Sequence, residues 1–529
     1  MEKHKNSKFS IALPLIIVVS IIAGMFLAKY SGFSKGNAFV ASTGNTKLDL
    51  ILDYIEKEYV DSISQEELIE KTIPLILEQL DPHSGYIAAE EFNDVNDPLE
   101  GEFEGIGVQF NIQKDTVVIV QVIVGGPSER VNIKAGDRIV KVNDSLIAGT
   151  GINSNKVVKL LKGPKNTKVK VGIFRPGSEK LLDFNIVRDK IPFYSIDASY
   201  MATDKIGYIK ISRFAMTTYE EFTEHAQKLK DKGMTKMILD LRGNGGGIFD
   251  AAIMIADEFL DKGKTIVYTQ GKASPREDYY SNAGGICVNT ELVILLNEES
   301  ASASEVLAGA IQDNDRGTIV GRRSFGKGLV MSQKQFNDKS AVRLTVSRYY
   351  SPTGRCIQKP YTEDIKDYYS EIYQRDFIHE KDSIHFPDSL KFKTPGGKIV
   401  YGGGGIMPDV YVAYDTTKYS QLLSDLISKS IMYDFAFDYA DKNRPQLAPL
   451  NTNTEFKNFF EKNNVFKKFI SHIDKKEIKY NANDLSKSEK TIKIRLYSFI
   501  VRNIKDDSGF YPLYNEDDET FLKAVEVLK

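Results

Sequence analysis

Three short segments of this chain carry residue types whose spacing could support catalysis. The first, residues 321–328, reads Gly-Arg-Arg-Ser-Phe-Gly-Lys-Gly and differs by one residue from a phosphate-binding P-loop. A P-loop needs a Ser or Thr hydroxyl for Mg²⁺ at the position of Gly328, and then a helix whose N-terminus holds phosphate. Gly328 has no hydroxyl, and the apolar residues after it do not resemble a helix start. Nucleotide hydrolysis is therefore disfavoured.

The same segment contains Ser324 and Lys327 at the spacing used by some Ser–Lys acyl enzymes. That spacing works on a helix, where residues three apart share a face. Gly326 and Gly328 indicate a loop instead, and the companion Lys-Thr-Gly motif is absent from the chain. Ser324 and Lys327 are therefore not favoured as a catalytic pair.

A third segment, residues 300–305, reads Ser-Ala-Ser-Ala-Ser-Glu and joins a predicted strand to a predicted helix. A serine at such a turn is exposed and lies beside the N–H groups of a helix N-terminus, which can stabilise an oxyanion. The alternative is that one of these serines is only the N-cap of the helix. Residues 240–247, Asp-Leu-Arg-Gly-Asn-Gly-Gly-Gly, form a second such turn that could supply another N–H donor. They do not match a dinucleotide fingerprint, because Ile248 stands where the third glycine belongs.

The pattern around these segments predicts an α/β layer fold from residue 191 to 415, because strands and helices alternate along it. Predicted strands cover residues 206–211, 237–241, 292–296, 318–320, 341–350 and 410–412, and predicted helices cover 217–232, 248–260 and 302–312. Residues 361–393 are rich in charged and aromatic residues without a clear period and indicate an insertion. From 416 to 529 the pattern is amphipathic and predicts a C-terminal helical extension.

Residues 100–190 resemble a PDZ domain in the order, spacing and type of their residues. A PDZ domain binds a peptide tail as an added strand, here beside residues 108–112. We expect the backbone at Gly105, Ile106, Gly107 and Val108 to receive the terminal carboxylate of that peptide. The alternative is a small β-domain that only packs against its neighbours.

The N-terminus predicts a membrane anchor over residues 1–30. Lys3, Lys5 and Lys8 precede residues 9–28, which carry no charge. At 1.5 Å per residue this run is ~30 Å long, enough to cross a bilayer. A cleaved signal peptide is the alternative, but Phe26 two positions before Ala28 fits a cleavage site badly. The basic flank would stay in the cytoplasm, which places a single-pass protein in the inner membrane with its catalytic part in the periplasm or extracytoplasmic space.

After the anchor, residues 31–99 predict a tether followed by a helical region that ends near Asp81. The whole chain has 529 residues and a net charge of −2, which disfavours nucleic-acid binding by bulk charge. Its two cysteines, Cys287 and Cys356, exclude a Cys-rich zinc module, and no His-Glu-x-x-His motif occurs. No metal or cofactor is expected, and whether the two cysteines pair stays open.

Together these motifs resemble the carboxy-terminal processing peptidases (tail-specific proteases) over residues 45–415. The shared features are Leu80-Asp81-Pro82-His83-Ser84, the PDZ domain, Asp-Leu-Arg-Gly-Asn, Ser-Ala-Ser-Ala-Ser-Glu and Phe-Gly-Lys-Gly. The resemblance implies a crotonase-like α/β serine peptidase core that cleaves proteins with apolar C-terminal tails. It selects the middle serine, Ser302, as nucleophile and Lys327, twenty-five residues later, as general base. It implies an oxyanion hole made by the Ala303 N–H and by either Gly245 or Gly246.

One position departs from the family, which often has a glutamine four residues after the lysine to orient it. Here that residue is Met331, and the nearest glutamine is Gln333, which would share a face with Met331 in a strand and so could orient Lys327. A second hypothesis follows, in which the chain is a catalytically weak PDZ-type peptide-binding protein that retains the peptidase fold. A homo-oligomer or an adaptor protein stays open.

Overall fold

The computed structural model describes residues 46–282, 284–362, 364–378 and 387–529. The described residues divide into two compact units, with the boundary between Ile76 and Leu77. The first contains helix α2 (Thr46–Glu58) and most of helix α3 (Gln65–Glu78), within the stretch whose periodicity predicts helices. The proposed anchor, residues 9–28, lies outside the described residues. Among the described helices, none is both long and apolar enough to cross a membrane.

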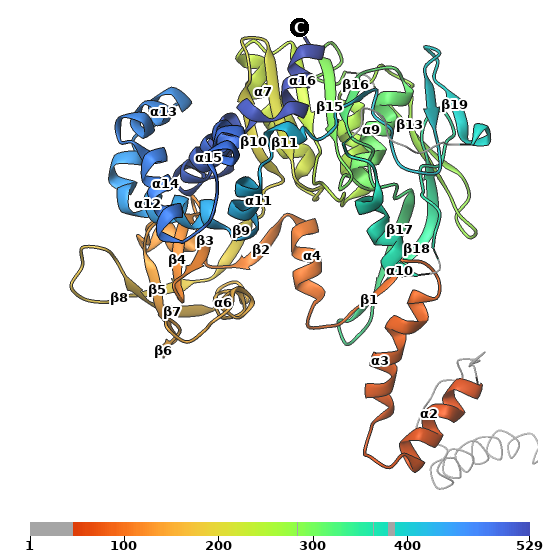
Figure 1. Ribbon diagram of the computed structural model, residues 1–529. Coiled ribbons are helices and arrows are strands. Elements are labelled where there is room, and N and C mark those ends of the chain that lie inside the picture. Colours follow the sequence, from red (N-terminus) through yellow and green to blue (C-terminus); the bar gives the residue numbers. More distant parts are fainter. Residues whose placement is uncertain (1–45, 283, 363, 379–386) are drawn as a thin grey trace, which may run out of the picture. The chain divides into compact units, whose positions relative to one another are not determined.

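Within the second unit, α4 (Phe92–Glu100) leads into an antiparallel β-domain (Figure 1). Its main sheet contains, in pairing order, β3 (Val108–Gln113), β4 (Thr116–Val122), β5 (Arg138–Val142), β7 (Lys168–Phe174) and β8 (Leu182–Val187), with β6 (Ser145–Leu146) beside β5. A smaller pair joins β2 (Glu102–Gly105) to β9 (Asp189–Pro192). Helices α5 (Pro127–Arg130) and α6 (Ser154–Leu161) complete the domain. These elements agree with the PDZ order predicted from the sequence.

A six-stranded sheet lies at the centre of the second unit. Its strands, in pairing order, are β10 (Ile196–Met201), β11 (Ile206–Ile211), β12 (Lys236–Asp240), β15 (Glu291–Leu296), β16 (Thr318–Gly321) and β21 (Val410–Tyr411). All pairs are parallel except β10 with β11. Because parallel strands end at the same edge, the turns after β12 and β15 lie next to each other. The sheet therefore brings residues 241–247 and 297–302 together.

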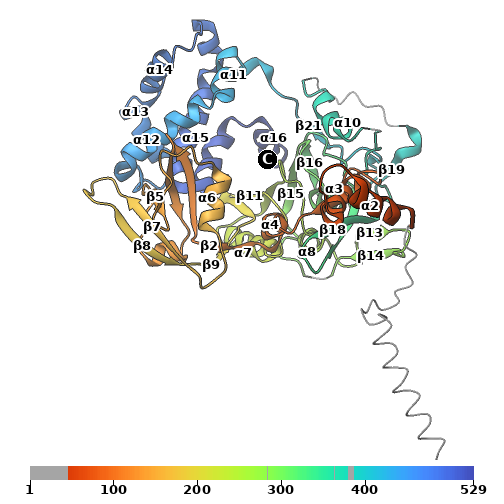
Figure 2. The same cartoon turned by 90° about the horizontal axis from the view of Figure 1, so that it is seen from below.

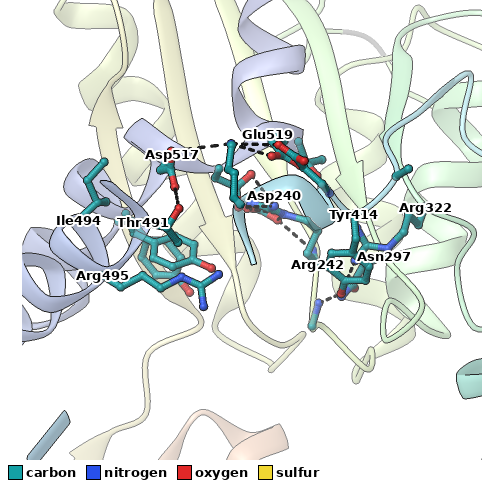
Figure 3. A pocket seen from close by; sticks show the side chains of 18 of the residues that line it. Asp240, Arg242, Asn297, Arg322, Tyr414, Thr491, Ile494, Arg495, Asp517 and Glu519 are labelled. Atoms are coloured by element: carbon teal, nitrogen blue, oxygen red, sulfur yellow. Dashed lines mark hydrogen bonds and ion pairs between the residues drawn. The ribbon is translucent and has the colours of Figure 1, made fainter. Parts of the chain in front are cut away.

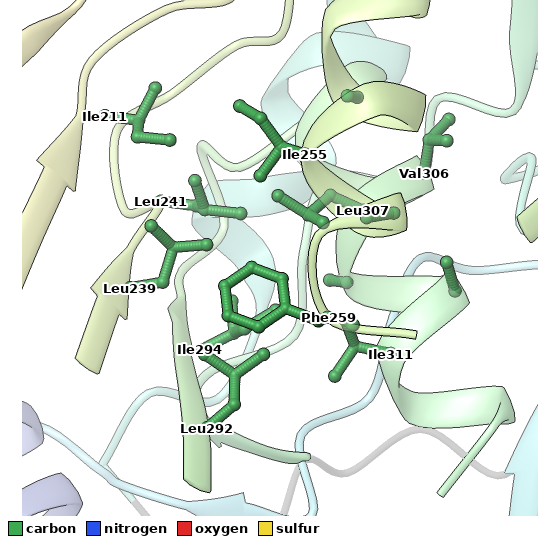
Figure 4. Packing of buried hydrophobic residues seen from close by; sticks show 14 of the residues in the cluster. Ile211, Leu239, Leu241, Ile255, Phe259, Leu292, Ile294, Val306, Leu307 and Ile311 are labelled. Carbon is green, nitrogen blue, oxygen red and sulfur yellow. The ribbon is translucent and has the colours of Figure 1, made fainter. Parts of the chain in front are cut away.

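Helices cover both faces of this sheet, because alternate strand residues point to opposite sides. On one face lie α7 (Thr218–Asp231), α8 (Phe249–Asp257) and α9 (Ala303–Asp313). There Leu239 and Ile294 pack with Phe259 and Leu307 (Figure 4). α9 starts at the Ser-Ala-Ser-Ala-Ser-Glu turn, and the packing of its apolar side chains fixes where that turn lies.

The opposite face is covered by α16 (Glu519–Val527), the last helix of the chain. Ile238 and Val293 from the sheet pack there with Phe521 and Leu528. The C-terminal end is therefore part of the layered core, although the sequence predicts only a helical extension.

A second sheet carries the strand that follows Gly328. It pairs β1 (Gly85–Ile87), β18 (Ala341–Tyr350), β13 (Thr265–Gln270) and β14 (Glu277–Tyr280), and β17 (Leu329–Gln335) pairs with β18. A strand, not a helix, thus comes after the Gly-Lys-Gly segment, which agrees with the rejection of a P-loop. The predicted insertion contains α10 (Ile365–Ser370), the 3-10 turns η1 (Glu371–Gln374) and η2 (Asp388–Leu390), and the start of the hairpin β19 (Lys391–Lys393)–β20 (Ile399–Tyr401).

The region after residue 415 is helical, as predicted. It comprises η3 (Thr416–Lys418), α11 (Gln421–Ser428), α12 (Ile431–Leu447), α13 (Asn453–Lys462), α14 (Val465–Lys475), α15 (Ala482–Tyr514) and η4 (Asn515–Asp517). These helices lie beside the PDZ sheet (Figure 2), where Arg138 pairs with Asp441 at 2.6 Å and Gln121 donates to Asp506 at 3.1 Å. Cys287 and Cys356 are both free thiols.

Candidate active site

Ser302 occupies a strained position at the N-cap of α9. Its φ and ψ are 55° and −114°, a backbone conformation that costs free energy for any residue with a side chain. Such strain persists only where surrounding contacts enforce it, and it is concentrated at functional sites. The contacts that enforce it here come from Ser300 and Ser304, from Glu305 and from Tyr349.

The three serines of residues 300–304 have different surroundings. The Ser300 hydroxyl donates to the Leu241 carbonyl at 2.9 Å, and the Ser304 hydroxyl donates to the Asn244 carbonyl at 2.8 Å. Both serines are fully buried, and both tie the α9 turn to the glycine-rich loop after β12. The half-buried Ser302 side chain takes no part in these contacts. Ser302 therefore differs from its two neighbours, and its selection as nucleophile stays a prediction of the family resemblance.

The buried carboxylate of Glu305 connects the Ser302 turn to the Lys327 loop. Its Oε2 accepts the backbone N–H of Ser302 and the backbone N–H of Lys327, each at 2.8 Å. Its Oε1 accepts the Ser324 hydroxyl at 2.5 Å and the Gly326 N–H at 2.7 Å. Burial raises the pKa of Glu305, whereas these four donors favour the carboxylate. One side chain therefore fixes both backbones.

Tyr349, on β18, forms a second bridge between the same two residues. Its hydroxyl lies 2.6 Å from the Lys327 carbonyl and 3.2 Å from the Ser302 carbonyl. The Lys327 side chain is partly buried, and burial is the main reason that its pKa lies below the usual lysine value. The positive charge of Arg343 lowers that pKa further, while Glu305 and Asp81 act in the opposite direction. Such surroundings favour the neutral amine that a general base requires.

The two candidate oxyanion glycines are in different places. A Cβ on Gly246 would lie 2.8 Å from the Ser302 Cβ and 3.0 Å from the Ala303 nitrogen, so this glycine packs directly against the turn. Gly245 faces open space. The Gly246 N–H donates to the Asn244 side chain at 2.9 Å. Of the two, Gly246 lies against the Ser302 turn, with its N–H held by a local hydrogen bond.

Among the described residues, the hydrogen bonds of the Gln333 side chain go to Asn96 and Arg343, and none joins it to Lys327. Its amide donates to Asn96 on α4 at 3.1 Å and accepts from Arg343 at 2.8 Å. The reason is the strand register. Gln333 lies directly opposite Arg343 in the β17–β18 ladder, so its side-chain amide bonds to that guanidinium. The orienting role suggested by strand periodicity therefore has no hydrogen bond to support it, and Lys327 is positioned through its backbone.

Besides Glu305 and Tyr349, two more residues near Lys327 were not assigned to the site from the sequence, His83 and Asp81. His83 bonds the Tyr368 hydroxyl through Nε2 at 2.9 Å, and its ring lies 6.4 Å from that of Phe325. Burial and the charge of Lys327 lower the pKa of His83 to about 4, so it is neutral at physiological pH. Asp81 accepts the backbone N–H of His83 at 2.8 Å and shapes this loop. The Asp-Pro-His-Ser motif was the one sequence feature that could have pointed to these two residues.

The predicted tail-binding residues surround one groove of about 320 Å³ in the PDZ domain. Its apolar lining comes from Phe103, Ile106, Val108, Phe110, Val158 and Leu161. The carbonyls of Ile106 and Gly107 accept backbone hydrogen bonds from Ser128 and Ile123, while the N–H groups of these two residues have no partner within the described chain. Such a loop can bind a carboxylate. Lys162 also lines the groove and pairs with Asp97 of α4 at 2.9 Å.

Comparison with known families agrees with this architecture. A model of peptidase family S41 matches residues 205–367, and a model of the PDZ domain matches residues 105–186. A family of unknown function (DUF8443) matches residues 422–506, within the C-terminal helices.

Individual relatives have related names. The carboxy-terminal processing protease CtpA of Bacillus subtilis is 33% identical over 354 residues, covering 65% of this chain and 74% of that protein. The carboxy-terminal-processing protease of Bartonella bacilliformis is 34% identical over 351 residues, covering 64% and 80%. A solved photosystem II D1 C-terminal processing protease aligns with 71% of this chain and 88% of its own at 24% identity, with a TM-score of 0.37. With both curated relatives covered over most of their length, the chain belongs to the carboxy-terminal processing proteases of peptidase family S41 and is a serine-type peptidase.

Proposed function

We propose that this C-terminal processing protease works through a dyad in which Ser302 is the nucleophile and Lys327 is the general base. The observation that carries this proposal is the double bridge made by Glu305 and Tyr349, which contact the backbones of both residues. The lowered pKa of Lys327 supports its role, because a base must be neutral before it can accept a proton.

The reaction then proceeds in two steps. Lys327 Nζ takes the proton of the Ser302 hydroxyl as its oxygen attacks the scissile carbonyl, and Lys327 returns that proton to the leaving amine. Water hydrolyses the resulting Ser302 ester in the second step, again with Lys327 as base. The tetrahedral intermediates would be stabilised by the Ala303 N–H at the start of α9 and by the Gly246 N–H, once Gly246 releases Asn244.

Substrate selection is assigned to the PDZ groove. The N–H groups of Ile106 and Gly107, which have no partner among the described residues, would receive the terminal carboxylate of a substrate, and the apolar lining would take its last side chain. We further propose, from the sequence alone, that residues 9–28 anchor the protein in the inner membrane with its catalytic part outside the cytoplasm.

A second candidate function is that of a catalytically weak peptide-binding protein. It is favoured only by Met331 and by the lack, among the described residues, of a hydrogen bond from Gln333 to Lys327.

Ser302→Ala should abolish cleavage of a reporter protein with an apolar C-terminal tail, a loss on the order of 1,000-fold or more in kcat. Ser300→Ala and Ser304→Ala should remain active and unfold at lower temperature, because each loses a buried hydrogen bond worth ~1 kcal/mol. Cleavage assays and thermal unfolding of the three purified variants check this. Wild-type cleavage by Ser302→Ala would exclude the proposed nucleophile, and weak cleavage by the parent protein itself would favour the peptide-binding alternative.

The pH dependence of kcat/KM should follow Lys327. Because its pKa is lowered, the rate should rise with pH and level off before pH reaches the usual lysine value of ~10.4. Lys327→Arg should be as inactive as Lys327→Ala, since a guanidinium stays protonated. A pH–rate profile of the parent and initial rates of both variants test this. Substantial activity in Lys327→Arg would overturn the dyad.

The free tail of the substrate should control its cleavage. Amidating the C-terminus of the reporter, or adding Asp-Asp to it, should lower kcat/KM by about tenfold or more, because the loop loses a carboxylate ligand or the apolar groove meets a charge. The unmodified reporter with the same internal sequence is the control. Equal rates for all three tails would exclude this role for the groove.

A further inference from the structure

Arg242 lines a polar pocket of about 330 Å³ at the carboxyl ends of the central strands (Figure 3). One wall is made by residues that end or follow these strands, Lys210, Asp240, Asn297 and Arg322. The other wall comes from the C-terminal region, including Thr491, Arg495 and residues 517–520. Arg242 is thus the point at which the glycine-rich loop meets the last segment of the chain.

Two carboxylates hold the Arg242 guanidinium from different directions. Its Nε and Nη2 donate to Asp240 at 3.0 and 2.6 Å, and its Nη1 donates to both oxygens of Asp518 at 2.8 and 2.9 Å. The side chains of Arg242 and Asp518 are only 16% and 12% exposed. Hydrogen bonds between charged groups shielded in this way are stronger than neutral ones and fix geometry. The contact spans 276 residues of sequence.

Asp518 is itself held rigidly. Its carboxylate accepts the Phe521 N–H at 2.8 Å as the N-cap of α16, and α16 packs through Phe521 and Leu528 against the central sheet. On either side of it, Asp517 accepts the Thr491 hydroxyl at 2.7 Å and Glu519 pairs with Lys418 at 2.7 Å. The carboxylate that meets Arg242 is therefore placed by the fold, in contrast to a pair formed by mobile surface side chains.

The loop that Arg242 belongs to leads directly to the Ser302 turn. The next residue, Gly243, donates its N–H to the Asn297 side chain at 2.8 Å. Asn244 then accepts the N–H of residue 301 at 3.0 Å through its carbonyl and the Gly246 N–H at 2.9 Å through its side chain. A shift of Arg242 would thus be transmitted to Gly246, which packs against Ser302.

We propose that Asp518 is a positioning residue for the peptidase reaction. By clamping Arg242, the C-terminal segment holds the loop of residues 242–246 so that the Gly246 N–H can meet the developing oxyanion. This inference rests on the proposed roles of Ser302 and Gly246. In this proposal the end of the helical region contributes to catalysis indirectly, because Asp518 holds residues 242–246 in position.

The test uses Asp518→Asn in the full chain. Asparagine is as good an N-cap as aspartate, so α16 keeps its cap while the ion pair to Arg242 is lost. We expect kcat on the tailed reporter to fall about tenfold or more with KM unchanged, because small displacements of catalytic groups have effects of this size. Asp518→Glu should recover part of the rate. Glu526→Gln, which removes an exposed carboxylate of α16 whose ion-pair partner is Lys523, is the matched control and should keep the parental kcat.

A binding measurement separates positioning from general destabilisation. A peptide boronate that forms a tetrahedral adduct with Ser302 should bind Asp518→Asn about tenfold or more weakly, in step with kcat. The corresponding peptide acid should bind equally well to both proteins. Parental kcat and boronate affinity in Asp518→Asn, or an equal loss in Glu526→Gln, would overturn the inference. Ser302→Ala is assayed alongside: if it still cleaves, the proposed function fails, whereas an inactive Ser302→Ala beside a fully active Asp518→Asn refutes only the brace.

Discussion

The buried carboxylate of Glu305 is the interaction on which the active site depends. A carboxylate removed from water is costly unless hydrogen bonds satisfy it, and here four donors do so from two separate segments. Satisfying that one group forces the turn after β15 and the loop before β17 to meet. It also holds Ser302 at a positive φ that it would otherwise avoid. The free energy of folding thereby maintains the geometry of the proposed dyad.

The same site partly buries the Lys327 side chain and places it near the positive charge of Arg343. Burial is the main reason that its pKa falls and the charge of Arg343 lowers it further, while Glu305 and Asp81 act in the opposite direction. A lysine with a lowered pKa costs stability. That cost is offset by the two packed sheets, by the helices on both faces of the central sheet and by the capped C-terminal helix. Ser300 and Ser304 each donate a hydrogen bond to the glycine-rich loop after β12. The Ser302 hydroxyl takes no part in these bonds and is left for the proposed reaction.

The parallel strands and the two turns of the site could be predicted from the sequence because they depend on local patterns. Apolar runs located the strands of the parallel sheet, and the ends of β12 and β15 located the two turns. The spacing of Glu305 from Ser302, typical of a capping box, was the visible sign of its contact with the Ser302 N–H. Long-range partners could not be predicted. Periodicity does not show that α16 covers the central sheet, that Asp518 reaches Arg242, or that Arg343 takes the amide of Gln333. Strand β14, Glu-Asp-Tyr-Tyr, also lacks a strong pattern of its own, whereas β13 carries a run of β-branched and aromatic residues that already indicates a strand.

The most direct test of the Glu305 bridge is the kcat of Glu305→Gln on the tailed reporter, measured on protein shown by circular dichroism to be folded. Glutamine keeps the size of the side chain but replaces one acceptor oxygen with an NH₂ group, which then faces two donors. We expect kcat to fall on the order of 100-fold, because Ser302 and Lys327 lose their common anchor. A folded Glu305→Gln protein that cleaves at the parental rate would contradict this account.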